Sequence, residues 1–298
     1  MPLLQEIIAV LEQLAPLSLA EEWDNVGLLA GDRSMPVGRV MTCLTITPAT
    51  VEEACRRDAN LIVTHHPLPF RPLKSVTADQ TPGRLLLKLI EKRIAIYSAH
   101  TAFDSAQAGI NQHLAHGLGL QEIAPLIPAE DQEVGAGRCG LADEPQGLRE
   151  LAERIKSFLG IEQVQLVGED SHVCERIAIA CGSGGSFLEI ARQAGCNALV
   201  TGEASFHTCL EAEASGVGLI LAGHFASERF ALVSLADYLS EQLAEIEAWA
   251  SVDERDPLRQ PAGSSHRDRR RHRGQRSPSR GRRRGDPVSP GDVLLVVM

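Results

Sequence analysis

An internal repeat constrains the fold of this chain more than any other feature. Residues 39–66 (RVMTCLTITPATVEEACRRDANLIVTHH) align without gaps with residues 176–203 (RIAIACGSGGSFLEIARQAGCNALVTGE) at a constant offset of 137 residues. Six positions are identical, and the apolar positions coincide almost throughout. Each segment has the pattern of a buried strand, a helix and a second buried strand. The sequence therefore predicts an α/β chain of two related lobes that arose by internal duplication.

A pair of metal-type side chains follows in each half. His100 and Asp104 in AHTAFD have the same spacing as His224 and Glu228 in GHFASE, and each pair follows an apolar run typical of a buried strand. Residues four apart share one face of a helix, so an imidazole nitrogen and a carboxylate oxygen can reach one cation. These pairs are 124 residues apart, whereas the repeated segments are 137 residues apart. The first half therefore has about 13 extra residues between its second and third strands. The doubling predicts a duplicated metal site at strand-to-helix turns.

Two adjacent histidines, His65 and His66, end the apolar run LIVT just before Pro67. Neighbouring strand residues point to opposite faces. Where the strand unwinds, however, Pro67 biases His66 towards an extended conformation, and the two imidazoles can reach two neighbouring ions. The alternative is that both are ordinary polar residues at a strand end. The metal-type residues elsewhere in the chain favour the metal interpretation.

The repeat adds two further candidates. His100 is the counterpart of His224, and Glu203 is the counterpart of His66. We expect His100 either to hold a metal-binding carboxylate or a bound water by a hydrogen bond, or to be a strand-end histidine without a metal role. Glu203 is either an acidic residue of the site, at the position that corresponds to His66, or a solvent-exposed residue at the rim.

The glycine-rich stretch CGSGGS at 181–186 also lies between a predicted strand and a predicted helix. Backbone N–H groups at such a turn could hold a phosphate or carboxylate. The stretch matches neither the dinucleotide fingerprint nor the P-loop. The alternative is a tight turn that needs glycine for its backbone angles.

Composition indicates a cytoplasmic protein. In 298 residues, 44% apolar, no run reaches the roughly 18 apolar residues that span a bilayer. The N-terminal residues 1–17 have a helical pattern without a basic start, so we expect no signal peptide. The seven scattered cysteines lack a C-x-x-C pair and are typical of small buried side chains in a reducing compartment.

We expect three regions: a first α/β lobe at 1–125, a second α/β lobe with an inserted connection at 126–255, and a low-complexity tail at 256–298. In the connection, residues 144–160 predict a helix ending on a glycine, and residues 161–168 predict a strand.

The tail is rich in Arg, Ser, Gly and Pro, a composition typical of disorder. Residues 265–286 hold ten Arg and two Asp, a net charge of +8, so the remainder carries −10 − 8 = −18. This acidic body argues against nucleic-acid binding outside the tail. The tail could bind nucleic acid through phosphates, contact the acidic surface of its own oligomer, or be the product of a shifted reading frame. We favour the frameshift, because low complexity begins directly after VDERDPLR at 252–259.

Several motifs together resemble those of the NIF-three-like dinuclear metal-centre proteins, also called GTP cyclohydrolase 1 type 2 homologs. These motifs are EEWDNVGLLAGD at 21–32, THHPLPF at 64–70, HTAFD at 100–104, TGEASFH at 201–207 and GHFASE at 223–228. The resemblance covers residues 3–259. It implies a toroidal homohexamer of two-lobed α/β subunits, with two divalent metal ions in the cleft of each subunit.

The resemblance also implies a ligand set, which comprises His65, His66, Asp104, His224 and Glu228. By that resemblance Glu228 bridges the ions, His66 and Asp104 bind one, and His65 and His224 bind the other.

The resemblance also bears on three other polar residues. Asp24 and Asn25 in WDNVGLL form an Asx turn or contact a ligand or substrate, and the resemblance favours the cleft. Thr45 departs from the family pattern, which often has an acidic residue there.

Three functions remain open at this point. The first is a metal-dependent hydrolase of an unknown small molecule, with Zn, Mn, Fe or Ni as the divalent ion. The second is a metal-binding, metal-delivery or regulatory protein without catalysis. The third is a nucleic-acid-associated accessory protein that acts through the tail. No feature indicates a membrane partner.

Overall fold

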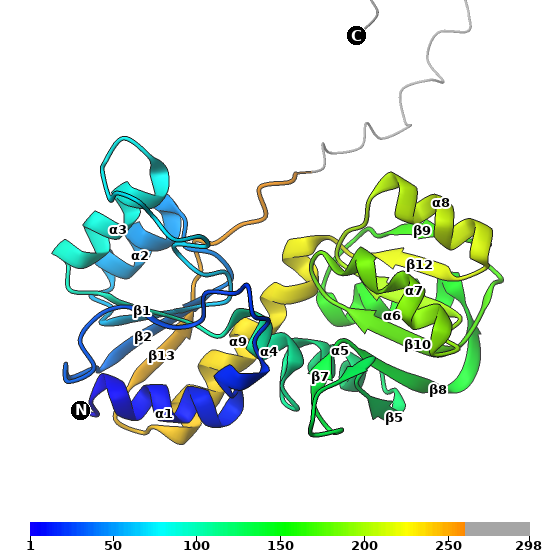
Figure 1. The fold of residues 1–298 in the computed structure, drawn as a ribbon, viewed down its shortest axis with the longest axis horizontal. Coiled ribbons are helices and arrows are strands. Elements are labelled where there is room, and N and C mark those ends of the chain that lie inside the picture. Colours follow the sequence, from blue (N-terminus) through cyan, green and yellow to red (C-terminus); the bar gives the residue numbers. More distant parts are fainter. Residues whose placement is uncertain (260–298) are drawn as a thin grey trace, which may run out of the picture. The chain divides into compact units, whose positions relative to one another are not determined.

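The computed structural model describes residues 1–259, of which residues 1–257 form one compact unit. The predicted disorder of the Arg-rich tail, its nucleic-acid contacts and its origin in a shifted frame concern residues almost all of which lie outside the described part. The described chain is an α/β protein with two main sheets, whose strands and helices are labelled in Figure 1. No helix within residues 1–259 is long and apolar enough to cross a bilayer.

The first sheet has five strands in the order β1-β4-β3-β2-β13. Strands β13, β2, β3 and β4 run parallel, and β1 pairs antiparallel with β4 at one edge. The strand bounds are β1 (Gly27–Ala30), β2 (Arg39–Cys43), β3 (Leu61–Thr64), β4 (Ala95–Ser98) and β13 (Glu247–Ala250).

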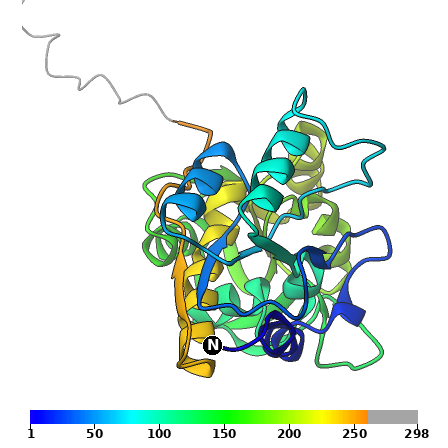
Figure 2. The ribbon, with the colours of Figure 1, turned by 90° about the vertical axis from the view of Figure 1, so that its left-hand side faces the viewer.

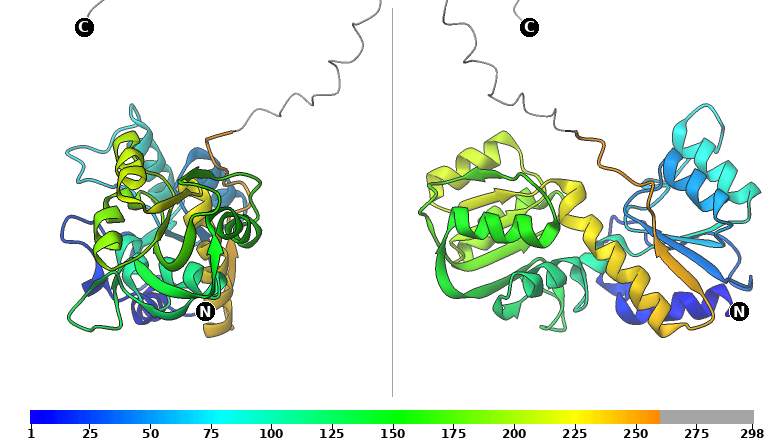
Figure 3. Two further views of the ribbon diagram at one scale, coloured as in Figure 1. Left: turned by 90° about the vertical axis from the view of Figure 1, so that its right-hand side faces the viewer. Right: turned by 180° about the vertical axis from the view of Figure 1, so that it is seen from behind.

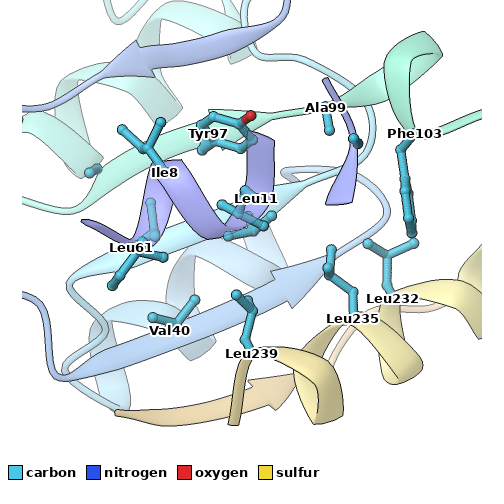
Figure 4. Packing of buried hydrophobic residues seen from close by; sticks show 14 of the residues in the cluster. Ile8, Leu11, Val40, Leu61, Tyr97, Ala99, Phe103, Leu232, Leu235 and Leu239 are labelled. Carbon is cyan, nitrogen blue, oxygen red and sulfur yellow. The ribbon is translucent and has the colours of Figure 1, made fainter. Parts of the chain in front are cut away.

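Two pairs of helices cover the two faces of this sheet, as Figure 2 shows in a view from that side. One face packs against α1 (Leu4–Leu14) and α9 (His224–Gln242), and the other against α2 (Pro48–Arg56) and α3 (Thr81–Glu91). The first face buries a cluster in which α1, three strands and α9 all contribute apolar side chains (Figure 4). These parallel strands are buried on both faces, which explains their continuous apolar runs.

The second sheet has six strands in the order β5-β8-β10-β11-β12-β9. Strands β10, β11 and β12 are parallel, and β8 and β9 pair antiparallel on either side of them. The bounds are β5 (Gln121–Ala124), β8 (Arg138–Gly147), β9 (Gln165–Val167), β10 (Val173–Ala180), β11 (Ala198–Thr201) and β12 (Gly218–Leu221). A separate hairpin pairs β6 (Ile127–Pro128) with β7 (Gly135–Ala136).

Helices cover both faces of the second sheet as well. One face packs against α5 (Ile110–Gly117) and α6 (Leu148–Leu159), and the other against α7 (Leu188–Gln193) and α8 (Phe206–Ser215). The short elements are η1 (Leu17–Leu19), α4 (His100–Ser105) and η2 (Gly184–Phe187). The predicted helix at 144–160 is confirmed as α6, which ends on Gly160 in a left-handed conformation at φ 67°. It begins four residues late, because residues 144–147 belong to β8.

The two repeated segments pair their strands in the same register. Val40 lies opposite Leu61 in the first sheet, and Ile177 lies opposite Ala198 in the second, which is the sequence offset of 137 residues at both positions. A side-chain hydrogen bond repeats as well. The Oδ1 atom of Asn60 accepts the backbone N–H groups of residues 38 and 39, and that of Asn197 accepts those of residues 175 and 176.

The third strands of the two lobes, β4 and β12, align at an offset of 123 residues, because Ser98 lies opposite Thr64 and Leu221 lies opposite Thr201. The offset between His100 and His224 is one residue larger. The turn before His224 is thus one residue longer than the turn before His100. It contains Gly223 at φ 89°, an angle that favours glycine.

Sheet membership departs from the expected boundary between the lobes. The predicted second lobe at 126–255 includes β13, but β13 pairs with β2 in the first sheet, and α9 packs beside it on that sheet. Figure 3 shows α9 running from the second lobe back to the first. At the other boundary, β5 lies before residue 126 but pairs with β8 in the second sheet. The placement of β13 was missed because pairing over more than 200 residues has no local sequence signal.

Two buried carboxylates hold the chain after β13 against the first lobe. Glu53 on α2 accepts hydrogen bonds from Trp249 Nε1 at 3.1 Å, Ser251 Oγ at 2.6 Å and the backbone N–H groups of residues 252 and 253. Glu254 accepts the backbone N–H groups of residues 44 and 45, and it pairs with Arg229 Nε at 2.7 Å. This segment therefore returns to the end of β2.

All seven cysteines are free. Cys43, Cys139, Cys174 and Cys196 are buried, as predicted for small apolar side chains, and the other three are partly buried.

Candidate metal centre

The adjacent histidines follow the last residue of β3. Backbone hydrogen bonds to the carbonyl groups of Cys43 and Leu44 hold His65 and His66 beside the end of β2. The side chain of His65 is only 1% exposed, whereas that of His66 is 24% exposed. The strand thus places one imidazole in the interior and the other at the edge of a cavity.

Glu228 connects these histidines to the second pair. It lies one turn into α9, with its side chain 5% exposed, and its Oε2 atom lies 3.2 Å from His66 Nε2 and 3.1 Å from His224 Nε2. Its Oε1 atom lies 3.8 Å from His65 Nε2. Asp104 Oδ1 lies 3.7 Å from the same nitrogen. The structure therefore brings all five predicted ligand residues together.

The donor atoms in this cluster fit a divalent cation. Neither ring nitrogen of the buried His65 nor Asp104 Oδ1 has a hydrogen-bond partner among residues 1–259. Buried polar atoms without partners are costly, so they indicate a missing ligand. The separations of 3.1–3.8 Å match those of ligand atoms that each lie about 2 Å from a shared cation. One compact set comprises His66, His224 and Glu228.

The charges in the cluster favour ligand forms for two of these groups. Burial lowers the pKa of His65 to about 3, so its imidazole is neutral. Burial would raise the pKa of Glu228, but the hydrogen bonds from His224 and His66 lower it below its usual range. The hydrogen bond to Glu228 raises the pKa of His224 to about 9. Burial, followed by the charge of Glu228, raises the pKa of Asp104. A bound cation would relieve this opposition between two buried carboxyl groups.

His100 lies against the cluster and is held by Asp24. Its Nδ1 atom donates to Asp24 Oδ1 at 2.8 Å, and Thr101 donates to the other oxygen from both its N–H and its hydroxyl group. Burial would raise the pKa of Asp24, but these hydrogen bonds lower it to about 2. His100 also forms a compact group of possible metal-binding atoms with His65 and His66. The structure thus places His100 at the cluster, with Asp24 behind it.

Glu203 lies behind His224, as Asp24 lies behind His100. Its Oε1 atom lies 3.0 Å from His224 Nδ1 and accepts the Ser183 hydroxyl group at 2.5 Å. These hydrogen bonds, first from Ser183 and then from His224, lower the pKa of Glu203. The Glu203 side chain is 55% exposed, unlike the 1% exposed Asp24. Glu203 therefore contacts a predicted ligand residue from the rim.

Asn25 does not contact the histidine cluster. Its Nδ2 atom donates to the carbonyl oxygen of Pro69 at 2.7 Å, and its backbone N–H group donates to Asp24 Oδ1 at 2.8 Å. It therefore links the Asp24 loop to the loop that carries Phe70.

The glycine-rich stretch 181–186 has the geometry of a close approach rather than of an anion cradle. The N–H groups of Cys181, Gly182 and Gly184 already donate to the side chains of residues 111, 227 and 201. A side chain at Gly182 would collide with Glu228, because its Cβ atom would lie 1.9 Å from Oε1. This glycine, at φ 63°, lets the loop pass directly over the carboxylate.

Sequence reasoning missed how the acidic Glu254 reaches Thr45. Thr45 Oγ1 lies 2.7 Å from His66 Nδ1, and Glu254 accepts the Thr45 backbone N–H group at 2.7 Å. An acidic side chain thus lies beside this strand end, although it comes from the C-terminal segment. The available signal was the acidic stretch VDERD at 252–256 together with the departure at Thr45.

A cavity of about 590 Å³ opens beside the cluster, which is large enough for a drug-sized ligand. His66, His100, Asp104, His224 and Glu228 all line it. The histidines and carboxylates therefore face a space that a small molecule can occupy. Fold and site together define a two-sheet α/β protein with a His–carboxylate cluster suited to a divalent cation.

Comparisons with known proteins agree with this class. The model of the Duf34/NIF3 (NGG1p interacting factor 3) family matches residues 2–257, so the chain belongs to that family. A relative in Clostridium perfringens, named GTP cyclohydrolase 1 type 2 homolog, is 35% identical over 258 residues, covering 86% of this chain and 98% of the relative. A Helicobacter pylori protein named GTP cyclohydrolase 1 type 2 is 34% identical over 238 residues, covering 78% of this chain and 90% of that protein.

A solved structure shares the fold. The crystal structure of a Bacillus cereus protein related to NIF3 superposes with a TM-score of 0.80 at 24% identity, covering 88% of this chain and 99% of that one. Family membership and fold therefore agree.

Proposed function

We propose that this protein is a dinuclear metal-dependent hydrolase that acts on a small molecule in the cavity beside His66 and His224. The observation that carries the proposal is the convergence of five imidazole and carboxylate side chains, several with buried atoms that lack partners. The relatives named after GTP cyclohydrolase support a hydrolytic reaction.

The proposed ligands divide around Glu228. His66 and Asp104 would hold one ion, and His65 and His224 the other, with Glu228 between them, as the family resemblance implies. The distances support the central position of Glu228, because one of its oxygens lies near His66 and His224 and the other near His65. The division of the other four ligands between the ions rests on the family resemblance. Imidazole and carboxylate ligands suit Zn, Mn, Fe or Ni.

When bound, the ions would lower the pKa of a water and polarise the bond to be cleaved. The chain itself supplies positioning around that chemistry. Asp24 fixes the ring of His100 at the cavity wall, and Glu203 fixes that of His224. Such carboxylate–imidazole pairs set the tautomer and orientation of the ring. His100 also lies where it can hydrogen-bond a substrate or water in the cavity.

Three broader features complete the proposal. The equal strand registers and the matching Asn60 and Asn197 hydrogen bonds support an origin of the two lobes by duplication. By family resemblance the subunits would assemble as a homohexamer. The free cysteines agree with a cytoplasmic location.

The first test is metal content per subunit by elemental analysis, on protein purified without a chelator or a metal-binding tag. We expect about two ions per chain in the wild type and strong depletion in Glu228→Ala. Glu241→Ala, which changes an exposed residue on the same helix, is the matched control and should retain the metal.

A hydrolase screen on the metal-loaded protein then separates catalysis from metal handling. Turnover should require the metal and disappear in His66→Ala, whereas His116→Ala, at an exposed helical histidine, should leave it intact. Exchangeable metal without turnover would instead favour the metal-delivery function. Little metal, unchanged in Glu228→Ala and not restored by added Zn or Mn, would contradict both.

A further inference from the structure

An aromatic wall forms one side of the cavity. The rings of Trp23, Phe70 and His100 lie with centroids 5.8–6.0 Å apart, and all three line the cavity. Trp23 is 61% exposed and Phe70 is 47% exposed. Large apolar side chains so open to solvent beside a polar cluster are typical of a ligand surface. The wall therefore offers ring faces on which a planar ligand can stack.

The second lobe also contributes apolar side chains to the cavity. Ile127, Phe187 and Ile190 line it from the hairpin strand β6, from η2 and from α7. A flat ring in the cavity would thus meet apolar side chains from both lobes. The histidine and carboxylate cluster is the main polar part of the lining, and Glu21 adds a further carboxylate.

The charges around the cavity are unsuited to a polyphosphate. Of the residues within 1–259 that line it, none is Lys or Arg, and three are carboxylic acids: Glu21, Asp104 and Glu228. Proteins that bind several phosphates surround them with Lys, Arg or free backbone N–H groups. The proposed metal ions already face Asp104 and Glu228, so they would neutralise only part of a triphosphate chain.

Three backbone donors nearest the cluster are already occupied. The glycine-rich stretch beside the cluster is the nearest phosphate-type loop, but the N–H groups of residues 181, 182 and 184 already donate to side chains. Glu203 also lies at this loop, bonded to Ser183, and would repel an anion.

We infer that the cavity selects a planar heteroaromatic compound without a phosphate chain, stacked on Trp23 and Phe70 with its reactive edge toward the cluster. A free base or nucleoside fits this class, and a nucleoside triphosphate does not. That this ligand is hydrolysed rests on the function proposed above, whereas its binding rests on the wall and the charges alone. The inferred ligand therefore differs from GTP, the compound that appears in the names of the relatives.

The test compares guanosine with GTP, which present the same ring with and without the phosphates. Affinities for both, GTP as its magnesium complex, are measured by titration calorimetry on the full-length protein as purified, with metal content determined on the same samples. We expect guanosine to bind at least about tenfold more tightly than magnesium GTP.

Phe70→Ala should weaken guanosine binding roughly 5- to 100-fold, the usual effect of removing one stacking ring. Phe206→Ala removes an aromatic side chain that is 73% exposed on α8 and does not line the cavity, so it should leave binding unchanged. Phe70→Tyr should restore most of the affinity. Glu21→Lys should improve the binding of magnesium GTP relative to guanosine.

Trp23 also reports where the ligand binds. The chain has two Trp residues, and Trp249 is buried against Arg57 and Glu53. Guanosine should therefore quench the wild-type emission, and the quench should disappear in Trp23→Phe, which keeps a ring at the wall.

Tighter binding of magnesium GTP than of guanosine, equal binding in Phe70→Ala and the wild type, or no guanosine binding at millimolar concentration would each overturn the inference. Metal content is an independent result. Protein that takes up no metal even with added Zn or Mn, yet still binds guanosine through Phe70, would refute the proposed hydrolase and uphold the aromatic wall.

Discussion

The two lobes carry the same pair of residues at the same structural position and use them differently. In the first lobe, His100 starts the six-residue helix α4 and is bonded to Asp24, which is almost fully buried. In the second, His224 starts the 19-residue helix α9 and is bonded to Glu203, which is half exposed. Each helix then presents a carboxylate, Asp104 or Glu228, to the same buried His65. The acidic positions are equivalent in the two lobes, whereas the imidazole positions differ.

The strand ends show the divergence most clearly. Where the first lobe has His65 and His66, the second has Gly202 and Glu203. A side chain at Gly202 would collide with the Gly182 carbonyl group and with Ser227 Oγ, both 2.6 Å from its Cβ atom. The second lobe thus has no room for a side chain where the first places His65. Two similar frameworks therefore supply different halves of one site.

The largest expected effect concerns the one buried carboxylate that has no counterpart. Glu53 corresponds in the repeat to Ile190, and it accepts several hydrogen bonds from the segment after β13. Glu53→Ala would leave several buried donors unpaired and should lower the free energy of unfolding by about 3–5 kcal/mol. Urea denaturation measures this loss. Glu52→Ala, at the exposed neighbouring position, should cost far less, and equal losses would contradict the role of Glu53.

The carboxylates Asp24 and Glu203, which bond His100 and His224, should differ in their effect on metal binding. Glu203→Ala removes the partner of a proposed ligand and should weaken metal affinity about tenfold, at the lower end of the usual range because the residue is exposed. Asp24→Ala should change the affinity less than about threefold, because His100 is not among the proposed ligands. Competition with a chelating dye measures both. A larger loss in Asp24→Ala would identify His100 as a ligand.

The pH dependence of stability should reveal the contribution of the buried Asp24. The pKa of Asp24 is about 2 in the folded protein and near 3.8 when unfolded, so the ionised form stabilises the fold. This contribution, roughly 1–2 kcal/mol, is fully present above about pH 4 and is lost as pH falls towards 2. The stability difference between wild type and Asp24→Asn, measured by denaturation, should shrink over that range. A stability difference that stays constant over this pH range would contradict the lowered pKa of Asp24.

The smallest effects should be equal in the two lobes. Asn60→Ala and Asn197→Ala each remove a carbonyl group that accepts two backbone N–H groups, and each should cost about 1–2 kcal/mol. The two losses should agree within about 0.5 kcal/mol if the lobes have equivalent frameworks. Denaturation curves of both variants provide the comparison, and a loss in only one lobe would break it.

Local patterns were enough to predict much of this framework. The gapless repeat predicted two strand–helix–strand segments, and the shared spacing of His100 and His224 placed both at helix starts. The adjacent His65 and His66 were predicted to meet Asp104, His224 and Glu228, and the structure brings these residues together. Such predictions succeed because apolar periodicity and strand-to-helix turns are encoded over a few residues.

Other features depend on contacts between distant segments. The pairing of β13 with β2 joins residues more than 200 positions apart, and a four-residue strand gives no indication of its partner. The approach of Glu254 to Thr45 follows from that pairing. The glycine-rich stretch was open to two interpretations, because only the structure shows which side chains occupy its N–H groups. The aromatic wall combines two loops, whose packing leaves no periodic signal.

The return of the chain to its first sheet has a consequence for how the protein is made. The core of the first lobe needs Leu232, Leu235 and Leu239 from α9 and Ile246 just before β13, so it lacks one side until almost the whole described chain has been synthesised. The second lobe draws its core almost wholly from a continuous stretch between about residues 110 and 222. Proteins generally fold from the N-terminus during synthesis. Here the second lobe can complete its core before the first, so translation would reverse the usual order.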